Sequence, residues 1–499
     1  MITDISSSIN RSILCVIGIT KKIRLLLTYS IYVTAITFIM NSSASATKNT
    51  VPDSPFGFTP AAVIPPFKYS LNNPYTFATD LGVRWDRSLN FVWTRIQPDL
   101  TTDQYDWPHD RQLRDAPHEI RLLANIMIGG PRHDARYGQY ALSNRSFLPR
   151  DEQAYTKFVQ NLVERYDGDG IADMPGLRVP IKYWQVDNEP PHGLNDYAAF
   201  LQMTYKAIKE ADPNAKVLIG GVPGFPPVSQ YIANFDRNYL PILDELGQFE
   251  EHCFDIFDLH WYGNATGDYL GIKDAYAHIQ NALKERKLLP PDGVWITEMG
   301  AYSGDPSPKR ILSFIDFPLQ TEKQQAADLV KRNVYALSLG IKKIFMCFGI
   351  TEGFKHTGGY FDFTGLIYDG RYDHDQGKGV KKLAYYTYKK MTEILEGSDW
   401  ASIQTLQQKD DIHIYRLNKN GKAVWIAWND SGTKTSVSLQ LDNKQQQVII
   451  TESVPASSSG KNLTSSSVIF RKVDGNISTS SPPNLSFELN DVPVFIEER

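Results

Sequence analysis

The sequence predicts an α/β protein, a (β/α)8 barrel followed by a small C-terminal antiparallel β-sandwich. From about residue 55 to residue 395, strand-like and helix-like segments alternate at the intervals of βα units. After Gly397-Ser398 the pattern changes to short alternating strands. No glycine-rich phosphate-binding turn follows the first strand, which disfavours a doubly wound sheet, the competing topology. We therefore expect a barrel over 51–397 and a sandwich over 398–499.

Eight strand-like runs can be assigned in the first region, and most are nearly continuous apolar stretches, as in parallel sheets that are buried on both faces. They are 56–58, 82–86, 121–128, 181–186, 216–221, 254–262, 294–300 and 343–349. Amphipathic helices are expected between several of them, at 151–166, from a cap at Asn195 to Asp212, and at 273–287, 321–339 and 381–395. Eight such units fit a closed barrel.

The C-terminal region shows the period-two alternation of half-buried strands. The expected strands are 411–417, 422–428, 435–441, 448–451, 484–489 and 492–496. Asn420-Gly421 between the first two is a strong signal for a two-residue hairpin. Short antiparallel strands joined by such turns predict a sandwich of two sheets.

The first 46 residues have the pattern of a secretory signal peptide. Lys21, Lys22 and Arg24 precede the apolar run 25–40, and Ala44-Ser45-Ala46 resembles a cleavage site. The run is short for a membrane span. We expect a secreted or periplasmic protein without stable membrane insertion after cleavage; an uncleaved anchor is the alternative.

Composition and charge narrow the range of partners. A formal net charge of −4 gives no basis for nucleic acid or an anionic membrane as a partner. The chain has three cysteines, and Cys253 and Cys347 lie in apolar contexts that favour buried free thiols over a disulfide. No His or Cys spacing typical of a metal site is present, so no metal or other cofactor is expected. The oligomeric state is left open.

Two of the expected strands end in a glutamate. The fourth continues into Asp187-Asn188-Glu189-Pro190, where proline must end the strand, and the seventh contains Glu298. Parallel barrels carry their chemistry at the carboxyl ends of the strands. Two carboxyl groups facing each other across the barrel mouth can hydrolyse an acetal, because one protonates the leaving oxygen while the other attacks or activates water. Asn188 could then bind a sugar hydroxyl.

Strand alternation indicates which side chains of the sixth strand face the barrel axis. Ile256, Asp258, His260 and Tyr262 share one parity and are expected inside. Phe257, Leu259 and Trp261 share the other and are expected against the helices. Buried polar side chains need partners, which suggests a polar pocket. Tyr262 could donate to a catalytic carboxylate, whereas Asp258 fits a pocket and a purely structural network equally well.

The same alternation predicts the directions of side chains on the seventh and second strands. With Glu298 inside, Trp295 and Thr297 are expected to face the helices. Arg84 is expected to point inward from the second strand, where its charge would lower the pKa of a neighbouring carboxylate. A structural ion pair inside the barrel is the alternative for Arg84.

The order of these residues resembles that of the clan A retaining glycoside hydrolases, with family 39-like members nearest and cellulase-like members next. It comprises Arg84 on strand two, Asn188-Glu189-Pro190 on strand four, His260-x-Tyr262 on strand six and Glu298 on strand seven. The resemblance implies that Glu189 is the acid/base, that Glu298 is the nucleophile and that Arg84, Asn188, His260 and Tyr262 surround the substrate.

One departure from that pattern concerns strand eight. Many clan members carry a tryptophan there beneath the first sugar, whereas this chain has the run Ile344 to Phe348, so Phe348 or a loop aromatic would serve instead.

The expected function is cleavage of a β-linked carbohydrate by double displacement. Two alternatives stay open: a non-catalytic carbohydrate-binding protein on the same barrel, and a metal-dependent hydrolase, which would need histidines that residues 56–64 lack.

Overall fold

The computed structural model describes residues 53–63, 73–132, 134–306, 317–373, 375–442, 447–464 and 466–498. The expected signal peptide, residues 1–46, lies outside these ranges. Among the described helices, none combines the length and the apolar character that a membrane crossing requires.

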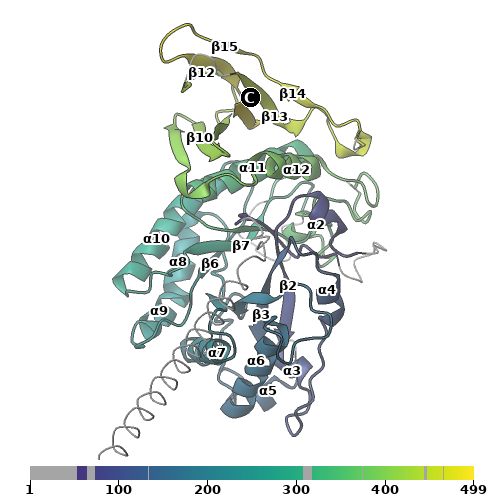
Figure 1. Ribbon diagram of the computed structural model, residues 1–499, viewed down its shortest axis with the longest axis vertical. Coiled ribbons are helices and arrows are strands. Elements are labelled where there is room, and N and C mark those ends of the chain that lie inside the picture. Colours follow the sequence, from purple (N-terminus) through teal and green to yellow (C-terminus); the bar gives the residue numbers. More distant parts are fainter. Residues whose placement is uncertain are drawn as a thin grey trace, which may run out of the picture. The chain divides into compact units, whose positions relative to one another are not determined.

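Eight parallel strands form the barrel (Figure 1). They are β1 (Phe56–Thr59), β2 (Trp85–Val92), β3 (Arg121–Met127), β4 (Ile181–Val186), β5 (Lys216–Ile219), β6 (Phe257–Trp261), β7 (Val294–Gly300) and β8 (Ile344–Cys347). The hydrogen-bonded order runs β5-β4-β3-β2-β1-β8-β7-β6. Parallel bridges between Leu218 and Ile256 and between Val222 and Leu259 link β5 to β6. The predicted (β/α)8 fold is confirmed.

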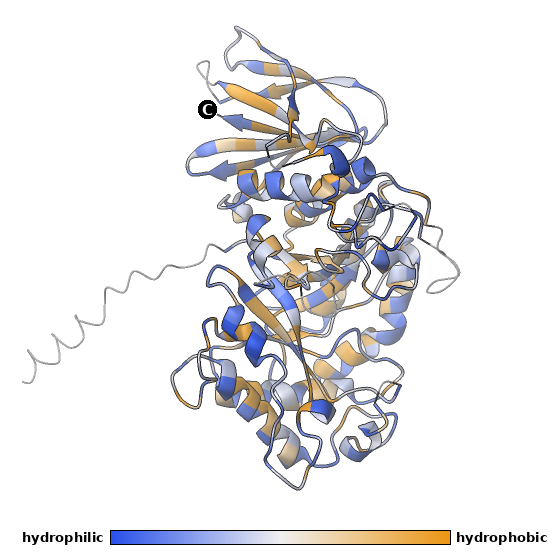
Figure 2. Ribbon diagram, turned by 90° about the vertical axis from the view of Figure 1, so that its right-hand side faces the viewer, coloured by the Kyte–Doolittle hydropathy of each residue, from blue (hydrophilic) through white to orange (hydrophobic). Residues whose placement is uncertain are grey.

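Helices cover the outside of this sheet. They are α2 (Thr76–Asp80), α3 (Trp93–Ile96), α4 (Asp110–Asp115), α5 (Tyr137–Tyr140), α6 (Glu152–Tyr166), α7 (Tyr197–Ala211), α8 (Val228–Asn238), α9 (Leu240–Leu246), α10 (Ile272–Glu285), α11 (Glu322–Ser338) and α12 (Leu383–Leu395). The longer ones alternate apolar and polar positions along their surface (Figure 2). Asp151 caps α6 through its side chain, whereas α7 starts after Asp196 and not after the predicted cap Asn195.

Apolar side chains fill the interior of the barrel near the start of the strands. The cluster contains Trp85, Leu123, Leu218, Ile256, Trp295 and Phe345. The rings of Trp85 and Trp295 meet edge to face with centroids 5.1 Å apart. This layer is the packed core expected of an eight-stranded barrel and closes the space beneath the polar residues at the carboxyl ends.

A β-bulge in β7 changes which residues face the interior. Leu259 pairs with Ile296, but the next residue, His260, pairs with Glu298, so Thr297 is an extra residue in β7. The prediction that Trp295 and Thr297 face the helices is therefore wrong, because a bulge reverses the alternation that the prediction assumed. Thr297 and Glu298 both contribute side chains to the interior.

The C-terminal region forms two antiparallel sheets, which confirms the predicted sandwich. Their strands are β9 (Gln404–Lys409), β10 (Ile412–Lys419), β11 (Lys422–Asn429), β12 (Thr435–Gln440), β13 (Val448–Pro455), β14 (Phe470–Lys472), β15 (Gly475–Ile477), β16 (Asn484–Leu489) and β17 (Val494–Glu498). The six-stranded sheet has the order β14-β13-β17-β11-β10-β9, and the three-stranded sheet has the order β12-β16-β15. Asn420 and Gly421, at φ 53° and 80°, form the predicted hairpin turn.

The barrel and the sandwich meet along α11 and α12, which contact β13. Glu322, at the start of α11, contributes to this contact. Its carboxylate accepts hydrogen bonds from Ser459 Oγ and from the backbone N–H of Gly460.

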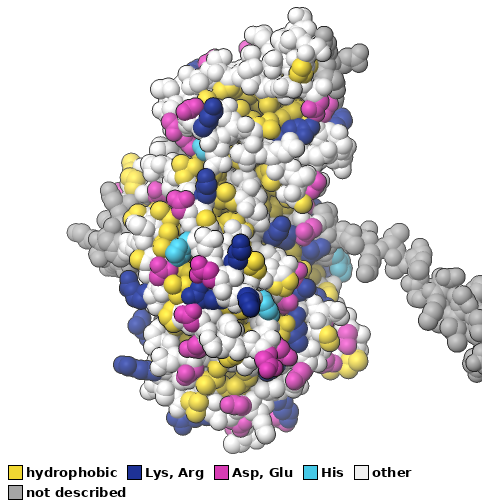
Figure 3. Space-filling view, turned by 90° about the vertical axis from the view of Figure 1, so that its left-hand side faces the viewer, with side chains coloured by type: hydrophobic (Ala, Val, Ile, Leu, Met, Phe, Trp, Pro, Cys, Tyr) yellow, Lys and Arg dark blue, Asp and Glu magenta, His cyan; other side chains and the backbone are white. Residues whose placement is uncertain are grey.

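On the face of the molecule that Figure 3 shows, positive and negative side chains are interspersed.

Candidate active site

The loop after β4 carries Glu189 in an unusual backbone conformation. Asp187 and Glu189 have φ values of 64° and 52°, in the left-handed region that non-glycine residues adopt at a cost of about 1–3 kcal/mol. The backbone N–H of Asp187 donates to Ile126 O at 2.9 Å, and Tyr197 Oη donates to Val186 O at 2.7 Å. These contacts to the neighbouring strand and helix stabilise the loop, and the Glu189 side chain reaches toward β6.

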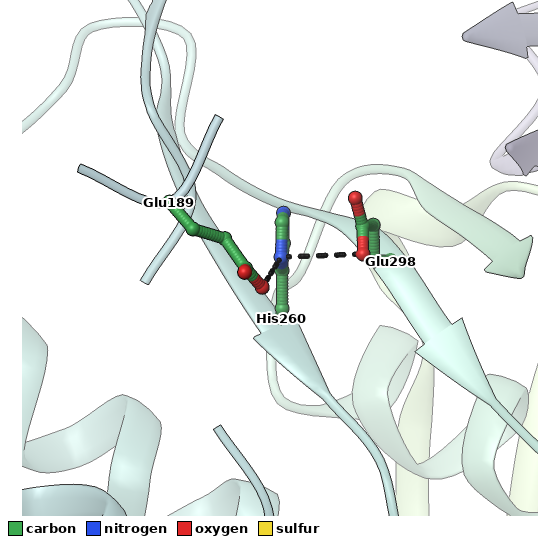
Figure 4. Close-up of side chains that lie close together, drawn as sticks. All are labelled: Glu189, His260 and Glu298. Atoms are coloured by element: carbon green, nitrogen blue, oxygen red, sulfur yellow. Dashed lines mark hydrogen bonds and ion pairs between the residues drawn. The ribbon is translucent and has the colours of Figure 1, made fainter. Parts of the chain in front are cut away.

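Glu189, His260 and Glu298 meet at the carboxyl ends of β4, β6 and β7 (Figure 4). His260 Nδ1 lies 2.8 Å from Glu189 Oε1 and 3.5 Å from Glu298 Oε2. One carboxylate oxygen of Glu189 lies within 4.8 Å of one of Glu298. The structure thus brings together the two glutamates that the sequence singled out. The Glu189 side chain is 29% exposed and that of Glu298 only 4%.

Both oxygens of Glu298 accept hydrogen bonds from fixed donors. Arg87 Nη1 donates to Oε1 at 2.8 Å, and Tyr262 Oη donates to Oε2 in a short hydrogen bond. Burial and the charge of Glu298 raise the pKa of Tyr262 well above its usual value, so the phenol keeps its proton at neutral pH. The predicted hydrogen bond from Tyr262 to Glu298 is present.

The arginine beside Glu298 is Arg87, not Arg84. Arg84 precedes β2 at the opposite end of the barrel, and its Nε lies 3.8 Å from Glu396 Oε1. The prediction of Arg84 as an inward-facing site residue is wrong: β2 begins at Trp85, and Trp85 and Arg87 are the residues that face inward. Arg84 makes an ion pair with Glu396, but outside the barrel interior and not inside it as the alternative proposed.

Two further interior residues link the site together and were not predicted. Gln185 on β4 accepts from Arg87 Nε at 2.7 Å and donates through Nε2 to Asp258 Oδ2 at 2.6 Å. A signal for Gln185 was available in the sequence, since a polar residue between the apolar residues Trp184 and Val186 lies on the opposite side of a regular strand from both of them. Arg87 was harder to predict. Its two-residue spacing from Trp85 places both side chains on the same side of a regular strand, but β2 contains a register shift after Asp86.

His260 is fully buried among carboxylates. Burial opposes its protonation, but the charges of Glu298 and Asp258 outweigh burial and raise its pKa to about 10. Its Nδ1 faces Glu189, and its Nε2 lies 3.3 Å from Asp258 Oδ2 and 3.2 Å from Thr297 Oγ1. Glu189, His260 and Glu298 each offer one ligand atom, and these atoms lie within 4.8 Å of one another, close enough to hold a metal ion.

Asn188 and Phe348, the remaining predicted substrate contacts, also lie beside this group. Asn188 Oδ1 accepts from Arg87 Nη2 at 2.5 Å. Phe348 follows β8 and packs in an aromatic cluster with Tyr262, but one face of its ring is stacked on Phe354 with centroids 4.0 Å apart. Phe354 therefore covers that face of the Phe348 ring.

Comparison with known proteins defines the class of fold. No protein-family model matches the sequence, and no curated protein matches it either. The solved structures that share its fold include glycoside hydrolases of the clan A type. The resemblance noted in the sequence is therefore confirmed for the fold.

Three of these structures have TM-scores between 0.56 and 0.58. A family 39 glycoside hydrolase from the gut symbiont Bacteroides cellulosilyticus WH2 has a TM-score of 0.57 at 14% identity, over 85% of this chain and 77% of that one. A family 51 α-L-arabinofuranosidase from Bifidobacterium longum has 0.58 at 13% identity, over 90% and 96%. A glucosidase from Croceicoccus marinus has 0.56 at 13% identity, over 89% and 97%.

Proposed function

We propose that this protein is a retaining glycoside hydrolase that cleaves a β-linked carbohydrate by double displacement. The observation that carries the proposal is the approach of the Glu189 and Glu298 carboxylates to within 4.8 Å. Retaining enzymes hold their two carboxyl groups about 5–5.5 Å apart, whereas inverting enzymes need about 6.5–9.5 Å to admit a water. The short separation favours direct attack by one carboxylate on the sugar.

The different surroundings of the two glutamates support the division of roles. Glu298 is buried and accepts from Arg87 and Tyr262, which suits a charged nucleophile that forms the glycosyl-enzyme. Glu189 is more exposed and reaches the site from a loop, which suits an acid that protonates the leaving oxygen and then deprotonates water. Arg87 and Tyr262 would also align the Glu298 oxygens for attack.

The nature of the sugar is a separate part of the proposal. An equatorial, β-type bond is proposed from the sequence resemblance, and Asn188 is proposed to bind a sugar hydroxyl beside Arg87. The neighbouring structures are described as an arabinofuranosidase and a glucosidase, so they support carbohydrate as the substrate without selecting one sugar.

The test is hydrolysis of a panel of aryl glycosides by the purified protein, with product configuration followed by NMR. We expect retained configuration, and loss of activity by about 10⁴-fold or more in Glu298→Gln. Glu152→Gln, at the exposed start of α6, is the control. Inverted product would overturn double displacement. Saturable sugar binding without turnover would instead favour the non-catalytic alternative.

We also propose export of the protein, on the basis of the signal-like residues 1–46 alone. Expression with and without these residues, followed by cell fractionation, tests it. Equal retention of both forms inside the cell would contradict it.

A further inference from the structure

We propose that Asp258 is a positioning residue that keeps His260 doubly protonated and thereby directs the acidic proton of Glu189 toward the substrate. The inference rests on the proposed function, because it concerns the acid in that reaction. It assigns a role to a residue that the sequence left open between a pocket and a structural network.

The first observation is the donor set around Asp258. This side chain is fully buried. Its Oδ1 accepts from the backbone N–H of Thr297 at 2.9 Å, and its Oδ2 accepts from Gln185 Nε2 at 2.6 Å and from Thr297 Oγ1. An ionised carboxylate is an acceptor at every lone pair, so this environment suits the charged form. Asp258 therefore places a negative charge 3.3 Å from His260 Nε2.

The second observation is the arrangement of charge around His260. Asp258 faces it from β6, Glu298 and the Thr297 hydroxyl from β7, and Glu189 from the loop after β4. Arg87 and Tyr262 reach this group through Glu298. One ring thus lies among three carboxylates, Glu298, Asp258 and Glu189, which together raise its pKa to about 10 against the effect of burial. A protonated ring donates from both nitrogens.

The consequence for Glu189 follows from the two oxygens of a carboxyl group. Nδ1–H of the imidazolium donates to Glu189 Oε1, so the transferable proton of Glu189 must be on Oε2. A neutral ring with its proton on Nε2, facing Asp258, would present a lone pair at Nδ1. That lone pair would accept a hydrogen bond from protonated Oε1 and hold the proton away from the leaving group.

A second hydrogen-bond route from Asp258 leads to the nucleophile. It runs through Gln185 to Arg87 and from Arg87 to Glu298 Oε1. Asp258 therefore belongs to two series of hydrogen-bonded contacts. One leads through His260 to Glu189, and the other leads through Gln185 and Arg87 to Glu298. The contacts that link Asp258 to Glu189 pass through His260.

The experiment compares Asp258→Asn with the parent protein on two aryl glycosides of the same sugar. Phenol is a poor leaving group that needs protonation, and 2,4-dinitrophenol is a good one that does not. We expect kcat/KM for the phenyl glycoside at about pH 7 to fall at least about 50-fold, and that for the dinitrophenyl glycoside to fall less than about 5-fold. Loss of the anion lowers the pKa of His260, so the basic limb of the phenyl glycoside profile should move to lower pH.

Asp255→Asn is the matched control, since Asp255 is a buried carboxylate three positions earlier that accepts from Lys209 and Val217 outside the site. It should leave the ratio of the two substrates and the pH profile unchanged. Equal losses on both substrates with an unmoved pH profile in Asp258→Asn would overturn the proposal.

A second measurement does not depend on the folding of Asp258→Asn or on turnover. In the parent protein labelled with ¹⁵N-histidine, both ring nitrogens of His260, identified by their loss in His260→Gln, should remain protonated up to about pH 8. A neutral ring at about pH 7 would overturn the inference. If the parent hydrolyses no glycoside, the proposed function fails, and the protonation state of His260 is still decided by this measurement.

Discussion

Arg87 Nη1 donates to Glu298 Oε1 at 2.8 Å across 211 positions of the sequence, from β2 to β7. The guanidinium also donates to Gln185 on β4 and to Asn188 in the loop that follows it. The Arg87 side chain, from β2, thus contacts β4, the loop after β4 and β7. Its planar set of donors fixes the orientation of the Glu298 carboxylate, which a flexible ammonium group would not do.

Arg87→Lys should therefore lower kcat by about 100-fold or more, because the charge remains while the fixed donor geometry is lost. Arg84→Lys is the matched control and should change kcat less than about 2-fold, since Arg84 pairs with Glu396 outside the site. Steady-state kinetics on one aryl glycoside measures both. Equal effects of the two substitutions on kcat would contradict the conclusion that Arg87, and not Arg84, lies beside Glu298.

Tyr262→Phe removes the donor to Glu298 Oε2 and keeps the ring packed against Phe225 and Phe361. We expect kcat to fall about 10²-fold with little change in thermal stability, since one fixed hydrogen bond to the reacting carboxylate is lost. Tyr386→Phe on α12 removes a phenol that donates to Leu463 O and serves as the control. Full activity of Tyr262→Phe would show that this hydrogen bond does not assist the reaction.

Glu322→Ala should destabilise the contact between barrel and sandwich. Its carboxylate accepts from the backbone N–H of Leu383 at 2.7 Å and of Gly460 at 2.9 Å, and from Tyr368 Oη at 3.0 Å. Removing the acceptor leaves buried donors unpaired, so the free energy of unfolding should fall by about 2–5 kcal/mol. Urea unfolding measures the change. Glu285→Ala, exposed on α10, should cost less than about 0.5 kcal/mol, and a similar loss in both variants would contradict the prediction.

Asp430 should make the stability of the protein depend on acid pH. Burial opposes its ionisation, but His413 and Lys331, whose Nζ lies 2.6 Å from Oδ1, outweigh burial and lower its pKa. The folded pKa thus lies below the unfolded value of about 3.9. The stability from this ion is therefore present above about pH 4 and is lost as the pH falls through the folded pKa.

Asp430→Asn should accordingly lower the urea midpoint at about pH 7, and the difference from the parent should narrow toward about pH 3. Asp442→Asn, with an exposed carboxylate that pairs with Arg416, is the control with a small, uniform effect. A difference for Asp430→Asn that stays constant over this range would show that its charge does not contribute through a lowered pKa.

The fold class and the positions of both glutamates could be predicted from the local sequence pattern. Apolar strands of the right length between amphipathic helices specify the barrel, and Pro190 fixes where β4 must end. Period-two alternation placed Asp258, His260 and Tyr262 on the interior side of β6 correctly, because those three residues follow the regular pleat. The alternation of apolar and polar residues was sufficient to predict which side chains face the barrel interior wherever the strand was regular.

Which side chains lie beside the two glutamates could not be predicted from the local pattern, because it depends on tertiary contacts. The bulge in β7 brings Thr297 and Glu298 to the same side, and the start of β2 at Trp85 places Arg87 inside and Arg84 outside. Register between strands is set by pairing with residues that are distant in the sequence, so a shift of one residue is invisible in the local pattern and reverses every expected direction after it. The link from Asp258 through His260 to Glu189 likewise exists only once β6 and the loop after β4 have come together in the barrel.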